Sequence, residues 1–353
     1  MDPNTPCVSF IGIVDFTEQA RWVYCSESVN DLLGFEPSEL VGSPSLNLVH
    51  PDEFDQVKAM HYSTITQDRA AVLAYLRMRH KDPYKGYILC AISRTVCQNV
   101  LVGSVSFASP GPKAMHNAST AQEVRIITPS AKDFELRRWN DPNPMPPCPI
   151  PDRLRSTPSP AFSSSTQSRH NSPSPSPEAE APPHFDPLPE QSPRTALILN
   201  RFSVNCNVLY CSNDSLLSTT RVTGRSFYDF VAPKDEDTVR AWIDVIKGWG
   251  VNERGQPSDG GFGFGKFTLC VAGRDSSVRQ TEPAPARNRN GSHNANRDPG
   301  ARDHGRSQRS THSTPHGRDR NRRGSGNRDF KVDAIFSAHS DGLMVIIRKS
   351  SSR

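Results

Sequence analysis

The sequence predicts an α+β protein with two folded domains, each an antiparallel five-stranded sheet with short helices on one face, joined and interrupted by disordered segments. Three observations lead to this prediction. Hydrophobic residues make up only 35% of the 353 residues, well below the share of an ordinary globular chain. The 31 prolines and 22 glycines are clustered instead of being spread evenly. One succession of strand-like and helix-like patterns occurs twice along the chain.

The first succession begins with a predicted hairpin. Two runs rich in β-forming residues, 8–14 and 21–25, flank a short polar turn. Two short helical segments follow at 28–34 and 36–42. Each stops at a glycine, which tolerates the left-handed backbone that ends many helices. This start predicts two paired strands and then compact helical turns.

A longer helix and three strands complete the first domain, which is placed at 8–138. The helix is expected to start at 50–53, where a proline and two acidic residues suit the first turn. After the strands, apolar residues at 124–127 and 134–136 could cover either the open face or an edge of the sheet. The three strands are expected at about 71–80, 86–96 and 99–108.

The middle of the chain, 140–193, has the composition of a disordered linker. Sixteen of the 31 prolines lie there, and such a segment cannot bury a core. Ser-Pro and Thr-Pro pairs recur near Arg153 and Arg155, so that added phosphates would find basic partners. Proline-directed phosphorylation is therefore expected at Thr157, Ser159, Ser172, Ser174, Ser176 and Ser192.

The second succession repeats the first at a spacing typical of two copies of one domain. Residues 207–212 align with 21–26, and 232–236 align with 50–53. The folded pattern resumes near Ala196. The second copy is expected to hold a long helix at 235–248 and strands at 264–271, 330–336 and 342–347.

An Arg-rich tract, 274–328, interrupts this second copy. It holds thirteen Arg, no Lys and five acidic residues, so its net charge of +8 exceeds the +5 of the whole chain. The repeat places the tract at the tip of a hairpin, where an insertion costs little closure entropy. The second domain is then split into 195–273 and 329–350. The competing interpretation ends the domain near Gly273 and makes 330–348 a separate tail hairpin.

The motifs of the first copy resemble those of the PAS family. The stretches V-Y-C-S-E-S at 23–28, L-G-F-E-P-S-E-L-V-G at 33–42 and H-P-D-E at 50–53 are similar to the PAS signature in order and spacing. Within that family, the two regions look most like those of fungal regulators of the white-collar type. The resemblance implies a PAS fold for both copies and a role in sensing or protein interaction.

The resemblance also indicates where a cofactor would lie. Flavin-binding members form an adduct with a cysteine, but Ser45 stands at that position in the first copy and Phe227 in the second, while Cys206 lies in the opening hairpin. Haem-binding members use a histidine on the long helix, where His61 and Tyr62 fall. A satisfied or solvent-exposed histidine explains that position equally well. No cofactor and no metal site are therefore expected.

For some residues the sequence allows either a role in a binding site or a purely structural role. Four could line a small apolar cavity or belong to the core: Leu76, Met78, Cys90 and Ile92. The cysteines form no C-x-x-C pair and are expected to be free thiols, several of them buried in strands. The eight are Cys7, Cys25, Cys90, Cys97, Cys148, Cys206, Cys211 and Cys270.

Two features suggest nucleic acid. The motif G-F-G-F-G-K-F at 261–267 imitates an aromatic RNA-stacking strand, but we expect a glycine-flanked sheet strand there. The Arg-rich tract could still contact phosphates weakly and without sequence preference. Within the tract, 320–323 is a candidate nuclear-targeting signal.

The sequence thus favours a regulator over an enzyme. It shows no nucleophile–base arrangement, no phosphate-binding loop and no apolar run long enough to span a membrane. We expect a protein-interaction module of the nucleus or cytoplasm that pairs with a PAS-containing protein or a second copy and serves signalling or transcriptional regulation. The alternatives are a nucleic-acid-associated protein acting through the Arg-rich tract and a sensor of a small ligand.

Overall fold

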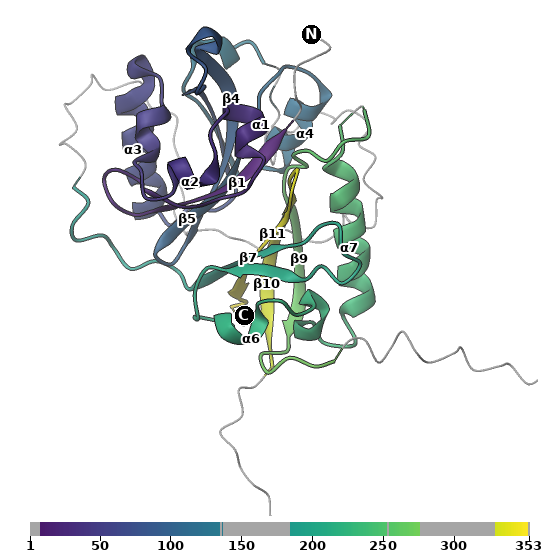
Figure 1. The fold of residues 1–353 in the computed structure, drawn as a ribbon. Helices are drawn as coiled ribbons and strands as arrows, with labels where there is room; N and C mark the ends of the chain where they lie inside the picture. Colours follow the sequence, from purple (N-terminus) through teal and green to yellow (C-terminus); the bar gives the residue numbers. More distant parts are fainter. Residues whose placement is uncertain (1–7, 135, 137–183, 253, 276–328, 352–353) are drawn as a thin grey trace, which may run out of the picture. The chain divides into compact units, whose positions relative to one another are not determined.

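The computed structural model describes residues 8–134, 136, 184–252, 254–275 and 329–351. The described residues up to Arg274 and from Asp329 onward belong to one compact unit that contains two sheets (Figure 1). Most of the predicted linker, with the phosphorylation sites from Thr157 to Ser176, lies outside the described residues. So does most of the Arg-rich tract, including 320–323.

The first sheet has six strands in the order β2-β1-β5-β4-β3-β6. The strands are β1 (Ser9–Asp15), β2 (Trp22–Cys25), β3 (Val72–Arg79), β4 (Tyr87–Cys97), β5 (Val100–Phe107) and β6 (Glu123–Ile126). The first five pair antiparallel, as predicted, and β6 adds a parallel strand along the free edge of β3. The segment after the fifth strand therefore covers an edge, one of the two roles expected for it.

Short helices cover one face of this sheet, as predicted. They are α1 (Val29–Leu33), α2 (Pro37–Leu40), η1 (Ser45–Leu48), η2 (Pro51–Glu53) and α3 (Phe54–Thr66). α1 ends at Gly34, whose φ of 78° is left-handed, and α2 begins with a capping box between Glu36 and Glu39. The helix α4 (Pro112–Thr120) was not predicted, and it contributes Ala118 to the apolar cluster on the opposite face.

The second sheet repeats the strand order of the first, as β8-β7-β11-β10-β9. Its strands are β7 (Arg194–Leu199), β8 (Val208–Cys211), β9 (Gly263–Leu269), β10 (Phe330–Ala338) and β11 (Leu343–Lys349). Its helices are α6 (Thr219–Val222), η5 (Phe227–Phe230) and α7 (Glu236–Trp249). β9 pairs with β10 across the Arg-rich tract, with Leu269 opposite Phe330. The interpretation of 330–348 as a separate tail hairpin is therefore wrong.

Glycines in β9 let the long helix α7 lie close to the second sheet. A Cβ on Gly263 would lie 2.4 Å from the Ile246 side chain, and one on Gly265 would lie 2.3 Å from the Trp242 ring. A close-packed interior leaves no room for such overlaps. The phenylalanines of the motif are buried or partly buried: Phe262, Phe264 and Phe267. Residues 263–267 of the motif thus lie in a packed sheet strand, as predicted, and the motif offers no exposed stacking surface.

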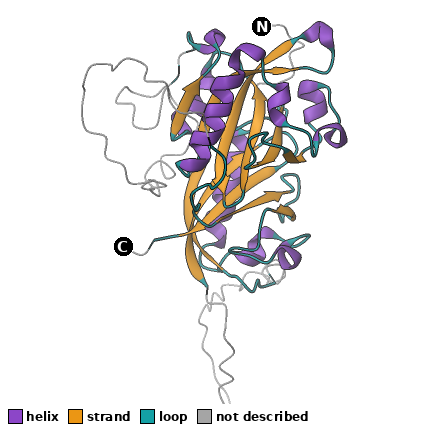
Figure 2. Ribbon diagram, turned by 90° about the vertical axis from the view of Figure 1, so that its left-hand side faces the viewer, coloured by secondary structure: helices purple, strands orange, loops and turns teal. Residues whose placement is uncertain are grey.

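The two sheets pack face to face through one shared apolar cluster (Figure 2). β1 and β5 contribute Ile11, Ile13 and Val102, and the second sheet contributes Ile198 and Ile346. Each of these residues is at most 1% exposed. The open face that an antiparallel sheet leaves on its own is therefore covered here by the second domain.

The contact between the sheets joins equivalent positions of the two copies. Tyr24 and Tyr210, which the sequence repeat aligns, stack with their ring centroids 5.3 Å apart. Ser26 and Ser212, two residues further along, have equivalent roles within their own domains, where each accepts a hydrogen bond from a backbone amide of the neighbouring strand, at 2.8 and 2.9 Å. Contacts between equivalent residues are the mark of a twofold interface. The two domains therefore form an internal pseudo-symmetric pair.

The hairpin turns reinforce this twofold arrangement. Asp341, in the turn between β10 and β11, accepts hydrogen bonds from the Ser26 hydroxyl and the Ser28 amide at 2.9 and 2.8 Å. Gln98, in the corresponding turn between β4 and β5, accepts from the Ser215 hydroxyl of the second domain. In each domain, the turn between the last two strands of the sheet thus accepts hydrogen bonds from the segment that precedes the first helix of the other domain.

Replacing residues 276–328 by a four-residue Asn-Gly turn should leave the second domain folded. β9 and β10 pair directly, so the loop between them must be closed in the folded protein. A shorter loop costs less entropy to close, and the free energy of unfolding should therefore stay equal or rise by on the order of 1–2 kcal/mol. Urea denaturation followed by tryptophan fluorescence measures this change. A shortened chain that aggregates, while a truncation at residue 273 stays folded, would contradict the pairing.

Candidate functional site

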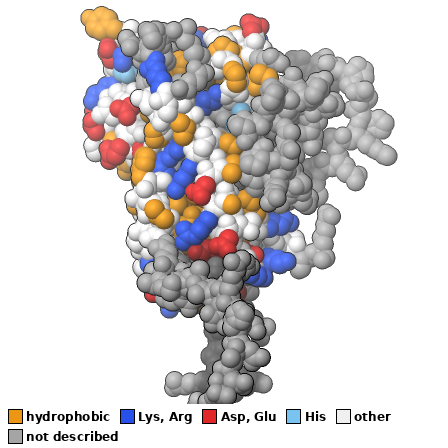
Figure 3. Space-filling model, turned by 90° about the vertical axis from the view of Figure 1, so that its right-hand side faces the viewer, with side chains coloured by type: hydrophobic (Ala, Val, Ile, Leu, Met, Phe, Trp, Pro, Cys, Tyr) orange, Lys and Arg blue, Asp and Glu red, His pale blue; other side chains and the backbone are white. Residues whose placement is uncertain are grey.

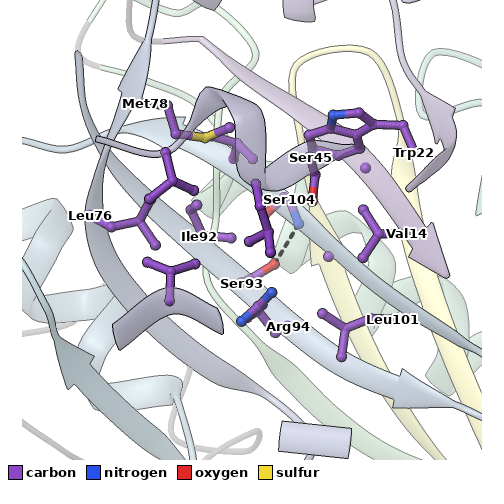
Figure 4. Close-up of a pocket in the computed structure, with 16 residues that line it drawn as sticks. Val14, Trp22, Ser45, Leu76, Met78, Ile92, Ser93, Arg94, Leu101 and Ser104 are labelled. Carbon is purple, nitrogen blue, oxygen red and sulfur yellow. Dashed lines mark hydrogen bonds between the residues drawn. The ribbon is translucent and has the colours of Figure 1, made fainter. Parts of the chain in front are cut away.

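A cavity of about 60 Å³ lies inside the first domain, between the sheet and its short helices (Figure 4). Strands β1 to β5 line it together with η1 and α3, and most of the side chains are apolar. The lining residues are Gly12, Val14, Trp22, Ser45, Leu46, Val49, Val57, Leu76, Met78, Ile92, Ser93, Arg94, Leu101, Gly103, Ser104 and Val105.

Two glycines border this cavity where β1 and β5 pair. Gly12 lies opposite Gly103. A Cβ on Gly12 would lie 2.6 Å from the Trp22 ring, and one on Gly103 would lie 1.8 Å from the Ser93 carbonyl oxygen. The missing side chain at Gly12 leaves room for the indole ring of Trp22, and the one at Gly103 lets the backbones of β4 and β5 approach. Larger residues at either position would force the cavity wall to move.

The second copy fills the equivalent positions with large side chains. The cross-strand row at this level of the first sheet is Gly12, Gly103 and Arg94. The equivalent row of the second sheet is Leu197, Val345 and Phe336. Both rows start opposite the cysteines that the repeat aligns, Cys25 and Cys211. Phe336 is fully buried, with its ring centroid 6.2 Å from that of Trp242, so an apolar core replaces the cavity and the charge.

Arg94 brings a positive charge into the cavity. The residue is 7% exposed, and its Nη1 has no hydrogen-bond partner among the described residues. Burial lowers the pKa of the guanidinium to about 10, which leaves it charged at neutral pH. A buried charge without a partner is strongly unfavourable. The position therefore lacks a compensating group.

Arg194 shows how the same unit satisfies another buried arginine. It is 1% exposed, and its Nη1 donates to the Asp68 carboxylate and, at 3.0 Å, to the Val96 carbonyl. Its Nη2 donates to the Asp68 carbonyl at 3.2 Å. This set of acceptors ties β7 of the second domain to the first domain. Within the described residues, Arg94 has no comparable set.

His61, the candidate haem ligand, is a buried residue on α3. Its Nε2 lies 3.2 Å from the Thr17 carbonyl oxygen, which can only accept, so we assign the proton to Nε2. Burial, followed by the charge of Arg94, lowers the pKa of His61 to about 3. The neutral ring thus has Nε2 engaged, and the neighbouring Tyr62 packs its ring against Phe185. The described residues include no cluster of three side chains able to hold a metal ion.

The other candidates from the sequence divide between cavity and core. Leu76, Met78 and Ile92 line the cavity, whereas Cys90 is fully buried outside its lining. Ser45 lines the cavity with a hydroxyl in place of the cysteine of flavin-binding members.

In the second domain, Phe227 and Cys206 belong to the apolar core. The six cysteines among the described residues are free and buried, as predicted. Burial raises the pKa of the Cys25 and Cys97 thiols to about 12, so both stay protonated and unreactive at neutral pH.

The sequence analysis did not name Arg94 as a candidate, although the pattern of residues in β4 indicates that it is buried. In β4 the residues Cys90, Ile92 and Val96 share the two-residue period of Arg94 and face the helix-covered side of the sheet. A lone arginine in phase with core residues is unusual, because arginine is almost never buried without a partner. This alternation identifies a charged residue that points into the domain.

Comparison with known proteins supports the fold. Residues 22–87 match the family model described as the PAS fold. No significant match was found among curated proteins. The chain therefore contains a PAS domain, and its second sheet has the same strand order. The PAS fold is a sensory fold and not a catalytic one.

Several solved structures are similar to part of the chain. The PAS domain of the Cronobacter turicensis quorum-sensing receptor RpfR in complex with BDSF is 13% identical and covers 30% of this chain and 99% of its own, with a TM-score of 0.26. The Drosophila melanogaster Cycle PAS-B with bound ethylene glycol is 16% identical and covers 28% and 99%, with a TM-score of 0.24. The N-terminal domain of a Marinobacter aquaeolei diguanylate cyclase with a PAS/PAC sensor is 15% identical and covers 28% and 94%, with a TM-score of 0.24.

Replacing Arg94 by methionine should stabilise the protein, whereas the same change at Arg194 should destabilise it. Arg94→Met removes an uncompensated buried charge, and we expect the free energy of unfolding to rise by about 1–3 kcal/mol. Arg194→Met leaves the Asp68 carboxylate without its buried partner and should cost about 3 kcal/mol or more. Urea denaturation of both variants measures the difference. Equal destabilisation by both would show that Arg94 is compensated in the folded protein.

The stability should fall in mild acid because of two buried histidines. Burial lowers the pKa of His61 to about 3 and that of His339 to about 4, whereas an unfolded histidine titrates near about 6.5. The unfolded chain therefore binds these protons first. The stabilisation is complete above that pH and is lost as the pH falls toward 4 and then 3, by up to about 1.4 kcal/mol per pH unit for each histidine.

Urea unfolding at several pH values between 7 and 4 measures this slope. His61→Gln removes one of the two titrating histidines. The free energy of unfolding of this variant should therefore depend less steeply on pH, by the contribution of His61. A slope that His61→Gln does not alter would contradict the neutral, buried state of His61.

Proposed function

We propose that this chain is a non-catalytic sensory regulator in which the cavity of the first PAS domain communicates with the second domain through the paired sheets. A PAS domain indicates a sensory or signalling module. The observation that carries the proposal is that the same strands line the cavity on one face and contact the second domain on the other. A change in the cavity thus acts on strands that also form the interface.

The alternation of side chains along β5 makes this connection direct. Leu101 and Val105 face the cavity. Val100 and Val102, the neighbours of Leu101 in the sequence, belong to the apolar cluster shared with Ile346 of β11. Because close-packed layers transmit small displacements, widening the cavity by a fraction of an ångström shifts the packing at the interface. The strand is therefore the mechanical link that the proposal requires.

A partner protein would receive the signal. A PAS-containing protein or a second copy of the chain remains the proposed partner, as does a role in signalling or transcriptional regulation in the nucleus or cytoplasm. The resemblance of the motifs at 23–53 supports kinship with fungal white-collar-type regulators. Since the two sheet faces cover each other, such a partner would use other surfaces, such as the strand edges where Val23 and Leu209 are exposed. Among the described residues, no helix is long and apolar enough to cross a membrane.

Nucleic-acid association is a second candidate, supported by the charge of the Arg-rich tract. On the face shown in Figure 3, basic and acidic side chains are intermixed, so the folded surface there adds no continuous basic patch. Binding through the tract would weaken steeply with salt and would show no sequence preference. The shortened chain that lacks 276–328 tests this candidate, because it should lose all such binding.

Changing the cavity alone should alter the second domain. After subtraction of the change in global stability measured by urea denaturation, we expect Arg94→Met to change the hydrogen-exchange protection of amides in β7 and β11 by about threefold, equivalent to about 0.6 kcal/mol. Hydrogen exchange followed by mass spectrometry resolves the strands. Arg79→Met, the same change at an exposed position of β3, is the matched control and should change nothing beyond its own strand. Exchange differences confined to the first domain would refute the communication between the domains.

A further inference from the structure

We infer that the cavity of the first domain binds a small aliphatic monocarboxylate, whose carboxylate group pairs with Arg94. This inference rests on the proposed function in one respect, since it names the class of ligand to which the sensory cavity would respond. Four features carry it: the uncompensated charge, the apolar walls, the volume of the cavity and the contrast with the second copy.

The positive charge of Arg94 predicts a ligand with a negatively charged group. The guanidinium of Arg94 lies among the lining residues, and its Nη1 finds no acceptor in the described part of the chain. The hydroxyls of Ser93 and Ser104, which come from the same wall, are 2.7 Å apart and engage each other (Figure 4). Arginine and a carboxylate form two parallel charge-assisted hydrogen bonds when both are withdrawn from water. An anionic oxygen pair is therefore the natural complement to this site.

Most of the wall disfavours a fully hydrophilic anion. Besides Arg94, the lining offers as donors the Trp22 indole N–H, which has no partner among the described residues, and serine hydroxyls, and the other side chains are apolar. Val14, Leu76, Ile92, Leu101 and Val105 offer no hydrogen-bond donor from their side chains. Phosphate or sulfate spreads its charge over all its oxygens, and several of them would face these walls without a partner. A monocarboxylate confines its charge to one end and presents methyl or methylene groups at the other, whose burial is favourable.

The volume limits the length of the ligand. A cavity of roughly 150 Å³ in another protein accommodates benzene, with its six carbon atoms. The present cavity of about 60 Å³ is less than half that size. It has room for a few non-hydrogen atoms, as in acetate or propionate, and a longer chain requires the walls to move apart. Such movement is the change that the sheets would pass on to the second domain.

The second copy shows that the PAS fold does not itself require this arrangement. At the equivalent level of the second sheet, Leu197, Val345 and Phe336 replace the two glycines and the arginine. Phe336 packs into the core without any charge to compensate. The charge and the space thus occur together in one copy and are both missing from the equivalent row of the other. This correlation is expected if the arginine serves a ligand.

Titration of the full chain with propionate tests the inference. We expect saturable binding with a dissociation constant on the order of 0.1–1 mM, as befits so small a ligand. Calorimetry gives the affinity, and NMR contacts between the propionate methyl group and the methyl groups of Leu76 and Ile92 locate the ligand. Propionamide, which has the same shape without the charge, should bind at least about tenfold more weakly. Chloride and phosphate should not displace propionate at equal concentration.

Two variants complete the test. Arg94→Met should weaken propionate binding at least about tenfold while the protein stays folded, and Arg79→Met should leave it unchanged. Arg94→Lys keeps the charge but loses the paired hydrogen bonds, so it should bind with intermediate affinity. Equal binding of propionamide, displacement by phosphate, or full affinity in Arg94→Met would each overturn the inference.

The outcome also separates this inference from the proposed function. Propionate binding without any change in exchange across the interface would keep the ligand class and refute the communication. Communication between the domains without carboxylate binding would refute the ligand class alone.

Discussion

The packing of the two sheets against each other is the interaction on which the rest of the unit depends. It buries both faces of the first sheet, because the short helices already cover the opposite side. Strands with two buried faces lose the alternation of apolar and polar residues that marks a half-exposed strand. The sequence S-F-I-G-I-V-D of β1 shows the result, with its first six residues buried. The burial of this second face also leaves the strands little freedom to move independently.

Much of the fold follows from local sequence signals. The glycines that end the short helices, the proline and acidic residues before α3 and the β-rich runs each act within a few residues, so they can be read without knowledge of the tertiary structure. The pairing of β9 with β10 could be predicted from the repeat, because the first copy supplies the missing hairpin. Cavity residues such as Leu76, Met78 and Ile92 could be named as candidates, because alternation assigns them to one side of the sheet.

Other features could not be predicted because they depend on contacts between distant segments. The twofold contact of Tyr24 with Tyr210 joins positions 186 residues apart, and each tyrosine alone has the pattern of an ordinary edge-strand residue. β6 and α4 are specified by the neighbours that they pack against more than by their own short patterns. The role of Arg94 depends on what surrounds its guanidinium, since Arg194 finds acceptors for both of its terminal nitrogens, whereas Nη1 of Arg94 finds none among the described residues.

The twofold interface joins two parts of a single chain, and this connectivity has a kinetic consequence. Two separate subunits meet at a rate that depends on their abundance, but tethered halves encounter each other at an effective concentration on the order of millimolar. Dilution therefore does not dissociate the pair. A free sheet of the same type could displace one half only by exceeding that local concentration. The covalent link thus keeps the two sheets paired whatever the concentration of the protein.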